Sequence, residues 1–195
     1  MKLLSAIALL ILSSLFSLDD PPITEILPVQ KSPSEINWLT WDEAVQLSEK
    51  GKKKIFLDVY TEWCRWCERM DTTTFKDPGV VEYINANFYP VRFDAEYKED
   101  IRYKDEVFKF VKNGKRGYHQ LAEKWLKGRL SYPTLVFMDE NQDVIQSIVG
   151  FKNTEKFRLI ATYFGSNEYR VTPWSTYCRN YEDEKQAVEN FPSKN

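Results

Sequence analysis

The chain has 195 residues, of which 43% are hydrophobic and 15% are aromatic. This length suits one domain with extensions, and this composition supplies enough apolar material for a packed core, which argues against wholesale disorder. The formal net charge is -2 with both signs mixed along the chain, so no basic excess indicates a nucleic-acid partner.

The N-terminal segment predicts export. Lys2 precedes a short apolar run and small serines, a pattern typical of a secretory signal peptide, which we expect to occupy residues 1–17. The apolar run is shorter than the ~20 residues of a membrane-spanning helix. An Ala-x-Ala cleavage pattern is missing, so an uncleaved N-terminal anchor is the alternative. Residues 18–35 contain four prolines and predict an extended linker. We therefore expect a periplasmic or secreted protein.

The first half of the expected domain, which spans residues 36–165, alternates between helices and strands. Thr40 and Glu43 have the spacing of a capping box, and Pro78 has the position of a first helical residue. The apolar run that ends at Tyr60 predicts a strand covered on both faces. The expected elements are a helix over 41–50, a strand over 55–60, helices over 65–74 and 78–86, and a strand over 88–93.

The segment 96–117 is rich in charge, with 12 charged residues among 22. Its main apolar residues recur at helical spacing and are Tyr103, Val107, Phe110 and Val111. This spacing predicts an amphipathic helix. We therefore expect a helical insert over about residues 96–130, ahead of the next strand.

The rest of the chain predicts a hairpin between helices. The polar residues 139–142 separate two apolar runs, which is a hairpin signal. The expected elements are a helix over 121–127, strands over 134–138 and 144–149, a helix over 154–164, and a helix from Pro173 within a tail over 166–195. Alternation followed by an antiparallel pair predicts an α/β fold with a mixed sheet.

Cys64 and Cys67 lie where the strand ends and a helix begins. The first turn of a helix has unpaired N–H groups and a partial positive charge, which stabilise a thiolate. Arg65 adds positive charge beside Cys64. A spacing of three residues places Cys67 on the same helical face. We therefore interpret Cys64 as the attacking thiol and Cys67 as the resolving thiol of a redox dithiol.

Three other interpretations of this pair remain open. A zinc site needs four ligands, and only Cys178 and His119 remain as further candidates. A purely structural disulfide is the second interpretation, and cysteines that only fill the core are the third.

The segment 58–67 resembles the active-site segment of the thioredoxin superfamily, in which an aspartate precedes the first cysteine by six residues and a tryptophan adjoins it. The segment 132–137 resembles the cis-proline segment of that family, and Gly150 its following glycine. Together with segment 73–80, the likeness is to exported bacterial thioredoxin-like proteins and to the thioredoxin-like domain of membrane thiol-reductant conductors. It covers about residues 36–165.

This resemblance implies a three-layer thioredoxin-like sandwich with roles for particular residues. Asp58 is expected to be a buried acid with a raised pKa that takes the proton of Cys67, the alternative being an ordinary hydrogen-bonded aspartate. Pro133 is expected to be cis and to present the backbone of Tyr132 to an extended substrate. Trp63 is expected to pack under the loop, and Trp66 to be exposed and to contact a partner.

The remaining chemically active residues favour structural roles. We expect His119, at a helix start, to be structural or exposed. We expect Cys178 to be a half-buried packing cysteine, with an intermolecular disulfide as the alternative.

The sequence therefore predicts a protein disulfide reductase acting on disulfide-containing proteins, with a membrane or soluble thiol as electron donor. We expect no cofactor, because no nicotinamide or flavin fingerprint is present, and no metal. The dipeptide Arg65-Trp66 matches neither Gly-Pro nor Pro-His, so an oxidase or isomerase stays open. The alternative from another class is a non-catalytic binding or folding-assistance module.

Overall fold

The computed structural model describes residues 34–51 and 53–189. The expected signal peptide and nearly all of the expected linker lie outside the described residues. Within the described ranges, no helix has both the length and the apolar character that crossing a membrane requires.

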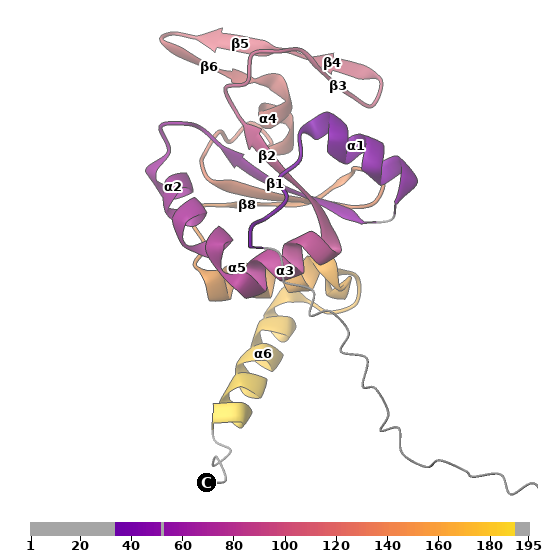
Figure 1. Cartoon of the computed structure of the whole chain (residues 1–195), viewed down its shortest axis with the longest axis vertical. Helices are drawn as coiled ribbons and strands as arrows, with labels where there is room; N and C mark the ends of the chain where they lie inside the picture. Colours follow the sequence, from indigo (N-terminus) through magenta and orange to yellow (C-terminus); the bar gives the residue numbers. More distant parts are fainter. Residues whose placement is uncertain (1–33, 52, 190–195) are drawn as a thin grey trace, which may run out of the picture. The chain divides into compact units, whose positions relative to one another are not determined.

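A mixed four-stranded sheet forms the centre of the fold (Figure 1). Its strands are β1 (Lys54–Tyr60), β2 (Phe88–Asp94), β7 (Thr134–Met138) and β8 (Val144–Val149). Their order is β2-β1-β7-β8, with β2 parallel to β1, β7 antiparallel to β1 and β8 antiparallel to β7. This arrangement confirms the predicted mixed sheet and places β1 between two neighbours, as its apolar sequence requires.

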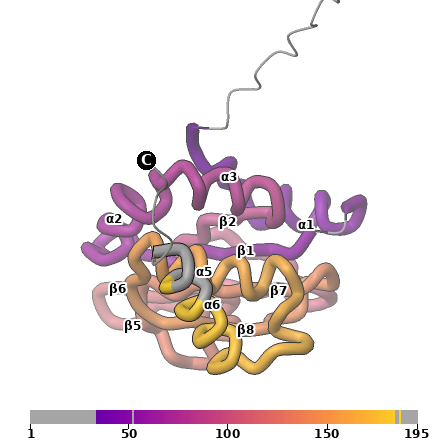
Figure 2. The backbone as a smooth tube through the Cα atoms, turned by 90° about the horizontal axis from the view of Figure 1, so that it is seen from below, coloured from indigo at the N-terminus to yellow at the C-terminus, as the bar shows by residue number. Residues whose placement is uncertain are grey.

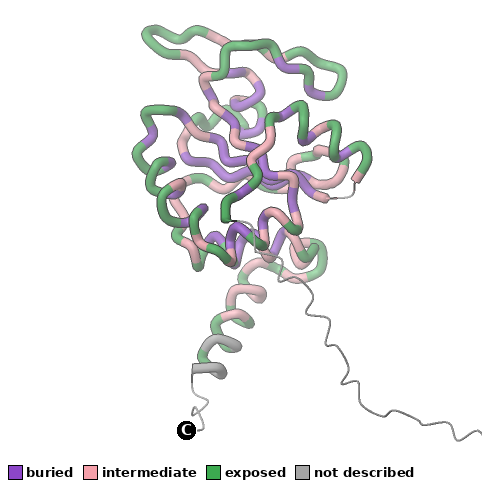
Figure 3. Tube along the Cα trace, in the orientation of Figure 1, coloured by how far each residue is buried: buried purple, intermediate pink, exposed green. Residues whose placement is uncertain are grey.

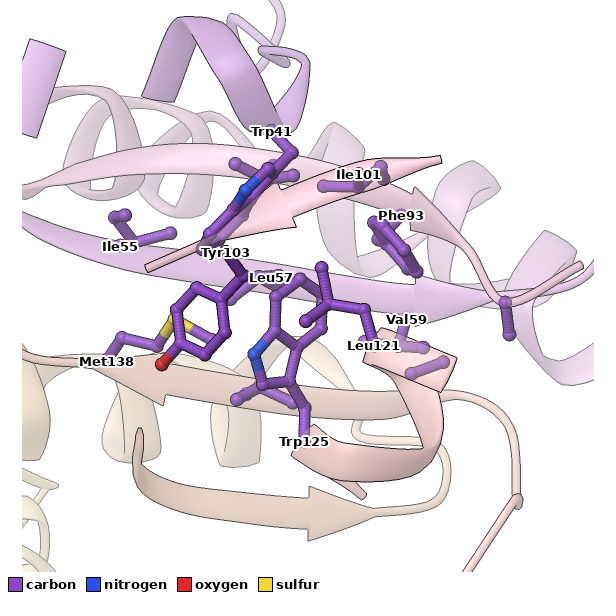
Figure 4. Packing of buried hydrophobic residues seen from close by; sticks show 14 of the residues in the cluster. Trp41, Ile55, Leu57, Val59, Phe93, Ile101, Tyr103, Leu121, Trp125 and Met138 are labelled. Carbon is purple, nitrogen blue, oxygen red and sulfur yellow. The ribbon is translucent and has the colours of Figure 1, made fainter. Parts of the chain in front are cut away.

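Alternate residues of β1 face opposite sides of the sheet. Ile55, Leu57 and Val59 pack against α1 (Trp41–Lys50) and α4 (Gln120–Trp125) (Figure 4). Aromatic rings dominate this core, and the ring of Trp125 lies 4.8 Å from that of Trp41.

Phe56 faces the other side of the sheet. There it belongs to a second buried cluster with residues of α2 (Arg65–Thr72), α3 (Pro78–Asn87) and α5 (Thr154–Gly165). Its ring lies 5.3 Å from that of Phe137 and 5.4 Å from that of Phe157. Helices on both faces of one sheet confirm the predicted three-layer arrangement.

The helix starts follow the expected capping chemistry. Thr40 and Glu43 form a complete capping box at α1. The Asp77 side chain accepts a hydrogen bond from the backbone of Val80 at the start of α3. The helix that carries the dithiol is shorter than expected, because α2 ends at Thr72 and the 3₁₀ helix η1 (Thr74–Lys76) follows.

The predicted helix over 96–117 is wrong, because this segment forms two β-hairpins. They are β3 (Ile101–Tyr103) with β4 (Glu106–Phe108), and β5 (Phe110–Asn113) with β6 (Arg116–His119). Figure 3 shows that they are largely exposed, whereas the central strands are buried. Within the expected insert over 96–130, the helical part is α4 (Gln120–Trp125).

Turn chemistry explains this difference. Each hairpin has a two-residue loop whose first residue has a positive φ, +55° at Lys104 and +61° at Gly114. A glycine in that position is a strong hairpin signal. The four-residue spacing of apolar side chains fits a helix, but β-branched and aromatic residues also suit short strands.

The tail contains the helix expected from Pro173, which is α6 (Trp174–Glu189). It follows the 3₁₀ helix η2 (Glu168–Arg170), begins close to α5 and extends away from the sheet (Figure 1), and it is seen nearly end-on in Figure 2. The Tyr163 ring of α5 lies 5.0 Å from Trp174 and 4.9 Å from Tyr177. Cys178 has a free thiol of intermediate burial on this helix.

Candidate functional site

Cys64 is the N-cap of α2, at the start of the helix as predicted. The backbone N–H of Cys67 donates a hydrogen bond to Cys64 Sγ at 3.1 Å. An N–H group aimed at sulfur from the first turn of a helix stabilises negative charge on that sulfur. The geometry therefore favours a thiolate at Cys64 in the reduced protein.

Cys64 and Cys67 are joined by a disulfide, with their Cα atoms 5.3 Å apart. Cys64 is 7% exposed and Cys67 is 2% exposed. Cys64 is thus slightly more exposed than Cys67, which lies one turn further into the helix. This order of exposure matches the order of attack predicted from the sequence.

Asp58 lies on β1 in the middle layer, six residues before Cys64 in the sequence. It is 1% exposed, and neither carboxylate oxygen has a hydrogen-bond partner among the described residues. Burial raises the pKa of Asp58 to about 7, with a further increase from Asp71 and an opposing decrease from Arg92. The expected buried acid with a raised pKa is confirmed, and such a group exchanges protons near neutral pH.

Arg92 connects Asp58 to the helix of the dithiol. It faces Asp58 in the parallel register of β1 and β2, with its Nε atom 3.9 Å from Asp58 Oδ2. Its terminal nitrogen forms a close ion pair with Asp71 of α2, one turn after Cys67. The guanidinium also lies 4.3 Å from the ring of Tyr60. Arg92 therefore opposes the increase in the pKa of Asp58 that burial and Asp71 produce.

The Tyr132–Pro133 peptide bond is cis, as predicted. The segment lies at the same end of the sheet as the dithiol, because β7 begins beside the end of β1, where Val59 pairs with Thr134. Gly150, with φ +89°, donates its backbone N–H to the carbonyl oxygen of Pro133 at 2.7 Å. This contact ties the start of β7 to the end of β8.

Two tryptophans flank the dithiol and both are exposed, Trp63 by 48% and Trp66 by 61%. The exposure of Trp66 agrees with the sequence, and its ring lies 5.3 Å from that of Phe151. The expectation that Trp63 packs under the loop is wrong. It stands at the surface, where its contacts come from Glu96, Tyr132 and Arg116.

The surroundings of Trp63 are well defined. Its Nε1–H donates to Glu96 Oε1 at 3.2 Å, and its ring meets that of Tyr132 edge-on at 5.9 Å. The guanidinium of Arg116 lies 4.1 Å from the indole ring. Burial, together with Glu96 and Asp94, raises the pKa of Tyr132 to about 12, so its hydroxyl keeps its proton.

His119 has a structural role. It is fully buried at the N-cap of α4, where Nδ1 accepts a hydrogen bond from the N–H of Leu121 at 3.1 Å. Nε2 lies 3.1 Å from the carbonyl oxygen of Glu99, and burial lowers the pKa of the imidazole. Across the described part of the chain, no three His, Cys, Asp or Glu side chains are grouped to hold a metal ion.

A family model described as "Thioredox_DsbH: Protein of unknown function, DUF255" matches residues 26–163. The chain belongs to the Thioredox_DsbH family. A solved thioredoxin-fold protein from Helicobacter pylori is similar to this family member in fold, with a TM-score of 0.51 and 17% identity over 71% of this chain and 86% of that chain. The thioredoxin fold expected from the sequence is thus confirmed.

Two curated relatives of this Thioredox_DsbH protein are much longer than the chain. Spermatogenesis-associated protein 20 of Rattus norvegicus is 31% identical over 81 residues, which are 41% of this chain and 10% of that protein. An uncharacterized protein of Caenorhabditis elegans is 29% identical over 91 residues, 46% of this chain and 12% of that protein. The chain spans about a tenth of the length of these relatives.

The sequence did not indicate four residues that surround the dithiol in this Thioredox_DsbH protein, which are Asp71, Arg92, Glu96 and Arg116. Alternation along β2 was the available signal for Arg92, because it places this arginine on the same face as Asp58 once the strands pair. The Gly114 turn was the available signal for the hairpin that carries Arg116.

Proposed function

We propose that this protein is a thiol-disulfide oxidoreductase that reduces disulfides of partner proteins in an oxidising extracytoplasmic compartment. The observation that carries this proposal is the hydrogen bond from the Cys67 N–H to Cys64 Sγ at the start of α2. The thioredoxin fold and the Cys-x-x-Cys pair support it. A cysteine pair at a helix start, where backbone N–H groups stabilise a thiolate, is suited to disulfide exchange.

The reaction begins with the reduced protein. The Cys64 thiolate attacks one sulfur of the substrate disulfide, forms a mixed disulfide, and the other substrate sulfur leaves as a thiolate. The Cys67 thiol then loses its proton to Asp58, and its sulfur attacks Cys64 Sγ. The second substrate thiolate leaves. Two electrons have passed to the substrate, and the protein holds the Cys64–Cys67 disulfide.

The cis Tyr132–Pro133 segment serves this reaction by presenting main-chain groups to an extended substrate at the same end of the sheet. Trp63 and Trp66 contact the apolar surface of the partner, since both rings are exposed beside Cys64. A membrane or soluble thiol donor must then reduce the disulfide. All electrons move between sulfur atoms, so the reaction uses no bound cofactor.

A trapping experiment tests this function. Cys67→Ser, made with Cys178→Ser to remove the tail thiol, is expected to hold substrates as mixed disulfides that dithiothreitol releases. The matched control is Cys64→Ser with Cys178→Ser, which should trap far less because it lacks the attacking sulfur. If neither variant traps partners and the double variant Cys64→Ser/Cys67→Ser keeps the cellular function, a non-catalytic module replaces this proposal.

Two further measurements decide direction and compartment. A reduction potential near -270 mV, about that of thioredoxin, is expected for a reductase, and a value near -120 mV would indicate an oxidant. Fractionation of cells that express the full chain tests the compartment, which rests on the export signal expected over residues 1–17.

A further inference from the structure

The β5–β6 hairpin carries a concentrated positive charge. Residues 109–119 include four basic residues and no acidic one. Three of the basic side chains are exposed and form no ion pair with any described carboxylate: Lys112, Lys115 and Arg116. The fourth, Lys109, pairs with Asp100 at 3.2 Å. Because the chain as a whole has a net charge of -2, this basic hairpin is a local feature.

The hairpin is held firmly beside the dithiol. The N–H of His119 donates to the carbonyl oxygen of Ala95 at 2.6 Å, directly after β2. The N–H of Gln120 donates to the carbonyl oxygen of Lys109 at 2.9 Å and closes the base of the hairpin. Lys98 lies 3.4 Å from the ring of Phe110. These contacts fix where the basic side chains stand.

Arg116 connects the hairpin to the redox site. Its guanidinium lies on the ring of Trp63, the residue that precedes Cys64, while Glu96 fixes that ring from the indole nitrogen. Stacking uses the face of a guanidinium and leaves its N–H edge free to bind a carboxylate with two hydrogen bonds. Arg116 is therefore held in place with its binding edge available.

A small cavity completes this surface. Its volume is about 170 Å³, and its lining includes Trp63, Tyr132, Leu130 and Arg116. It offers an aromatic and aliphatic wall with one cation at its border. Glu96 also lines it, but its carboxylate already accepts the hydrogen bond of Trp63. Glu96 keeps its negative charge, so Arg116 and Glu96 carry opposite charges at the cavity. The excess positive charge of the surface comes from Lys112 and Lys115 of the hairpin.

We propose that the β5–β6 hairpin and Trp63 form a docking surface for an acidic polypeptide segment that flanks the disulfide of the substrate. This inference rests on the proposed function, because a molecule that reaches Cys64 and also spans the hairpin is a disulfide-bearing polypeptide. Arg116 pairs with a carboxylate close to the substrate cysteine. Lys112 and Lys115 attract the acidic segment over longer distances and raise the association rate.

The experiment compares three substrates of the reduced full chain. Two are synthetic peptides with the same internal disulfide, one flanked by Asp and Glu and the other by Lys, and the third is bis(2-hydroxyethyl) disulfide. The acidic peptide is expected to have a kcat/KM about 10-fold above that of the basic peptide at about 0.01 M salt. This preference should largely disappear at about 0.5 M salt, where charges are screened within a few ångströms.

Arg116→Gln is expected to reduce the preference about 3- to 10-fold, since it removes a charge-assisted pair. Arg116→Lys should keep most of the salt-dependent preference, which separates lost charge from a disturbed hairpin. The matched control is Lys50→Gln, an equal charge change at the end of α1, before β1. It should leave the preference at its wild-type value.

The outcomes separate this inference from the proposed function. Equal kcat/KM for the two peptides, or an undiminished preference in Arg116→Gln, would overturn the acidic docking surface while reduction of the neutral disulfide leaves the function standing. No reduction of any of the three substrates would overturn the proposed function, and the docking surface with it.

Discussion

Arg92 faces Asp58 across β1 and β2, yet its Nε atom stops 3.9 Å from Asp58 Oδ2. Its terminal nitrogen is engaged by Asp71 of the dithiol helix instead. The buried carboxyl therefore receives the field of a cation without a hydrogen bond from it, and burial outweighs that field in setting its pKa. Because Arg92 lies near Asp58 and is paired with Asp71, the pKa of Asp58 depends on a charged residue of α2.

This coupling predicts opposite shifts from two substitutions. Arg92→Gln removes the charge that lowers the pKa of Asp58, so the pKa should rise above its value of about 7. Asp71→Asn removes a charge that raises it, so the pKa should fall. Carboxyl ¹³C NMR titration of the oxidised protein measures both. Shifts of the same sign in the two variants would contradict this account.

Asp58 should also make stability depend on pH. Its folded-state pKa of about 7 exceeds the unfolded value, so its contribution is fully present below about pH 4 and is lost as pH rises through 7. Relative to the wild type, Asp58→Asn should therefore gain stability between pH 4 and pH 8, by on the order of a few kcal/mol. Denaturant unfolding of the oxidised proteins measures this change.

The control for that measurement is Asp105→Asn, at an exposed turn of the β3–β4 hairpin. It should leave the pH dependence of the unfolding free energy at the wild-type slope. A constant difference between Asp58→Asn and the wild type across this range would show that Asp58 does not titrate as described.

Gly117 should be sensitive to a single added methyl group. A Cβ there would lie 2.2 Å from Phe110 Cζ and 2.4 Å from the backbone oxygen of Val111, so the hairpin must shift. We expect Gly117→Ala to destabilise the fold by about 1–3 kcal/mol. Gly79→Ala is the matched control, since its nearest contact is 3.3 Å and the helix favours alanine. Equal unfolding free energies for the two variants would count against the packing described here.

Trp125 should be a principal contributor to the core beneath the insert. It is fully buried, and its ring lies 4.9 Å from Phe93 and 6.0 Å from Tyr103. Trp125→Ala is expected to cost about 3–5 kcal/mol of unfolding free energy, and Trp125→Phe clearly less, because it leaves a smaller cavity. Chemical denaturation measures both. A loss below 1 kcal/mol for Trp125→Ala would contradict this packing.

The sequence alone identified the dithiol, its place at a helix start, the buried Asp58 and the cis Pro133. These features depend on neighbours within a few residues, or on a segment whose likeness to the thioredoxin superfamily is specific. The alternating elements of the central sheet were predictable for the same reason, since capping residues and apolar runs act locally.

Only the tertiary structure decided the form of segment 96–117 and the charged surroundings of the site. The spacing of Tyr103 and Val107 fits a helix, but the turns at Lys104 and Gly114, together with the packing of Tyr103 against Trp125, favour the strands. Arg92 reaches Asp58 through strand register, and Arg116 reaches Trp63 through a hairpin 53 positions later in the sequence. Such contacts join residues far apart in the chain, so local patterns indicate the strand and the turn but not the partner that each arginine reaches.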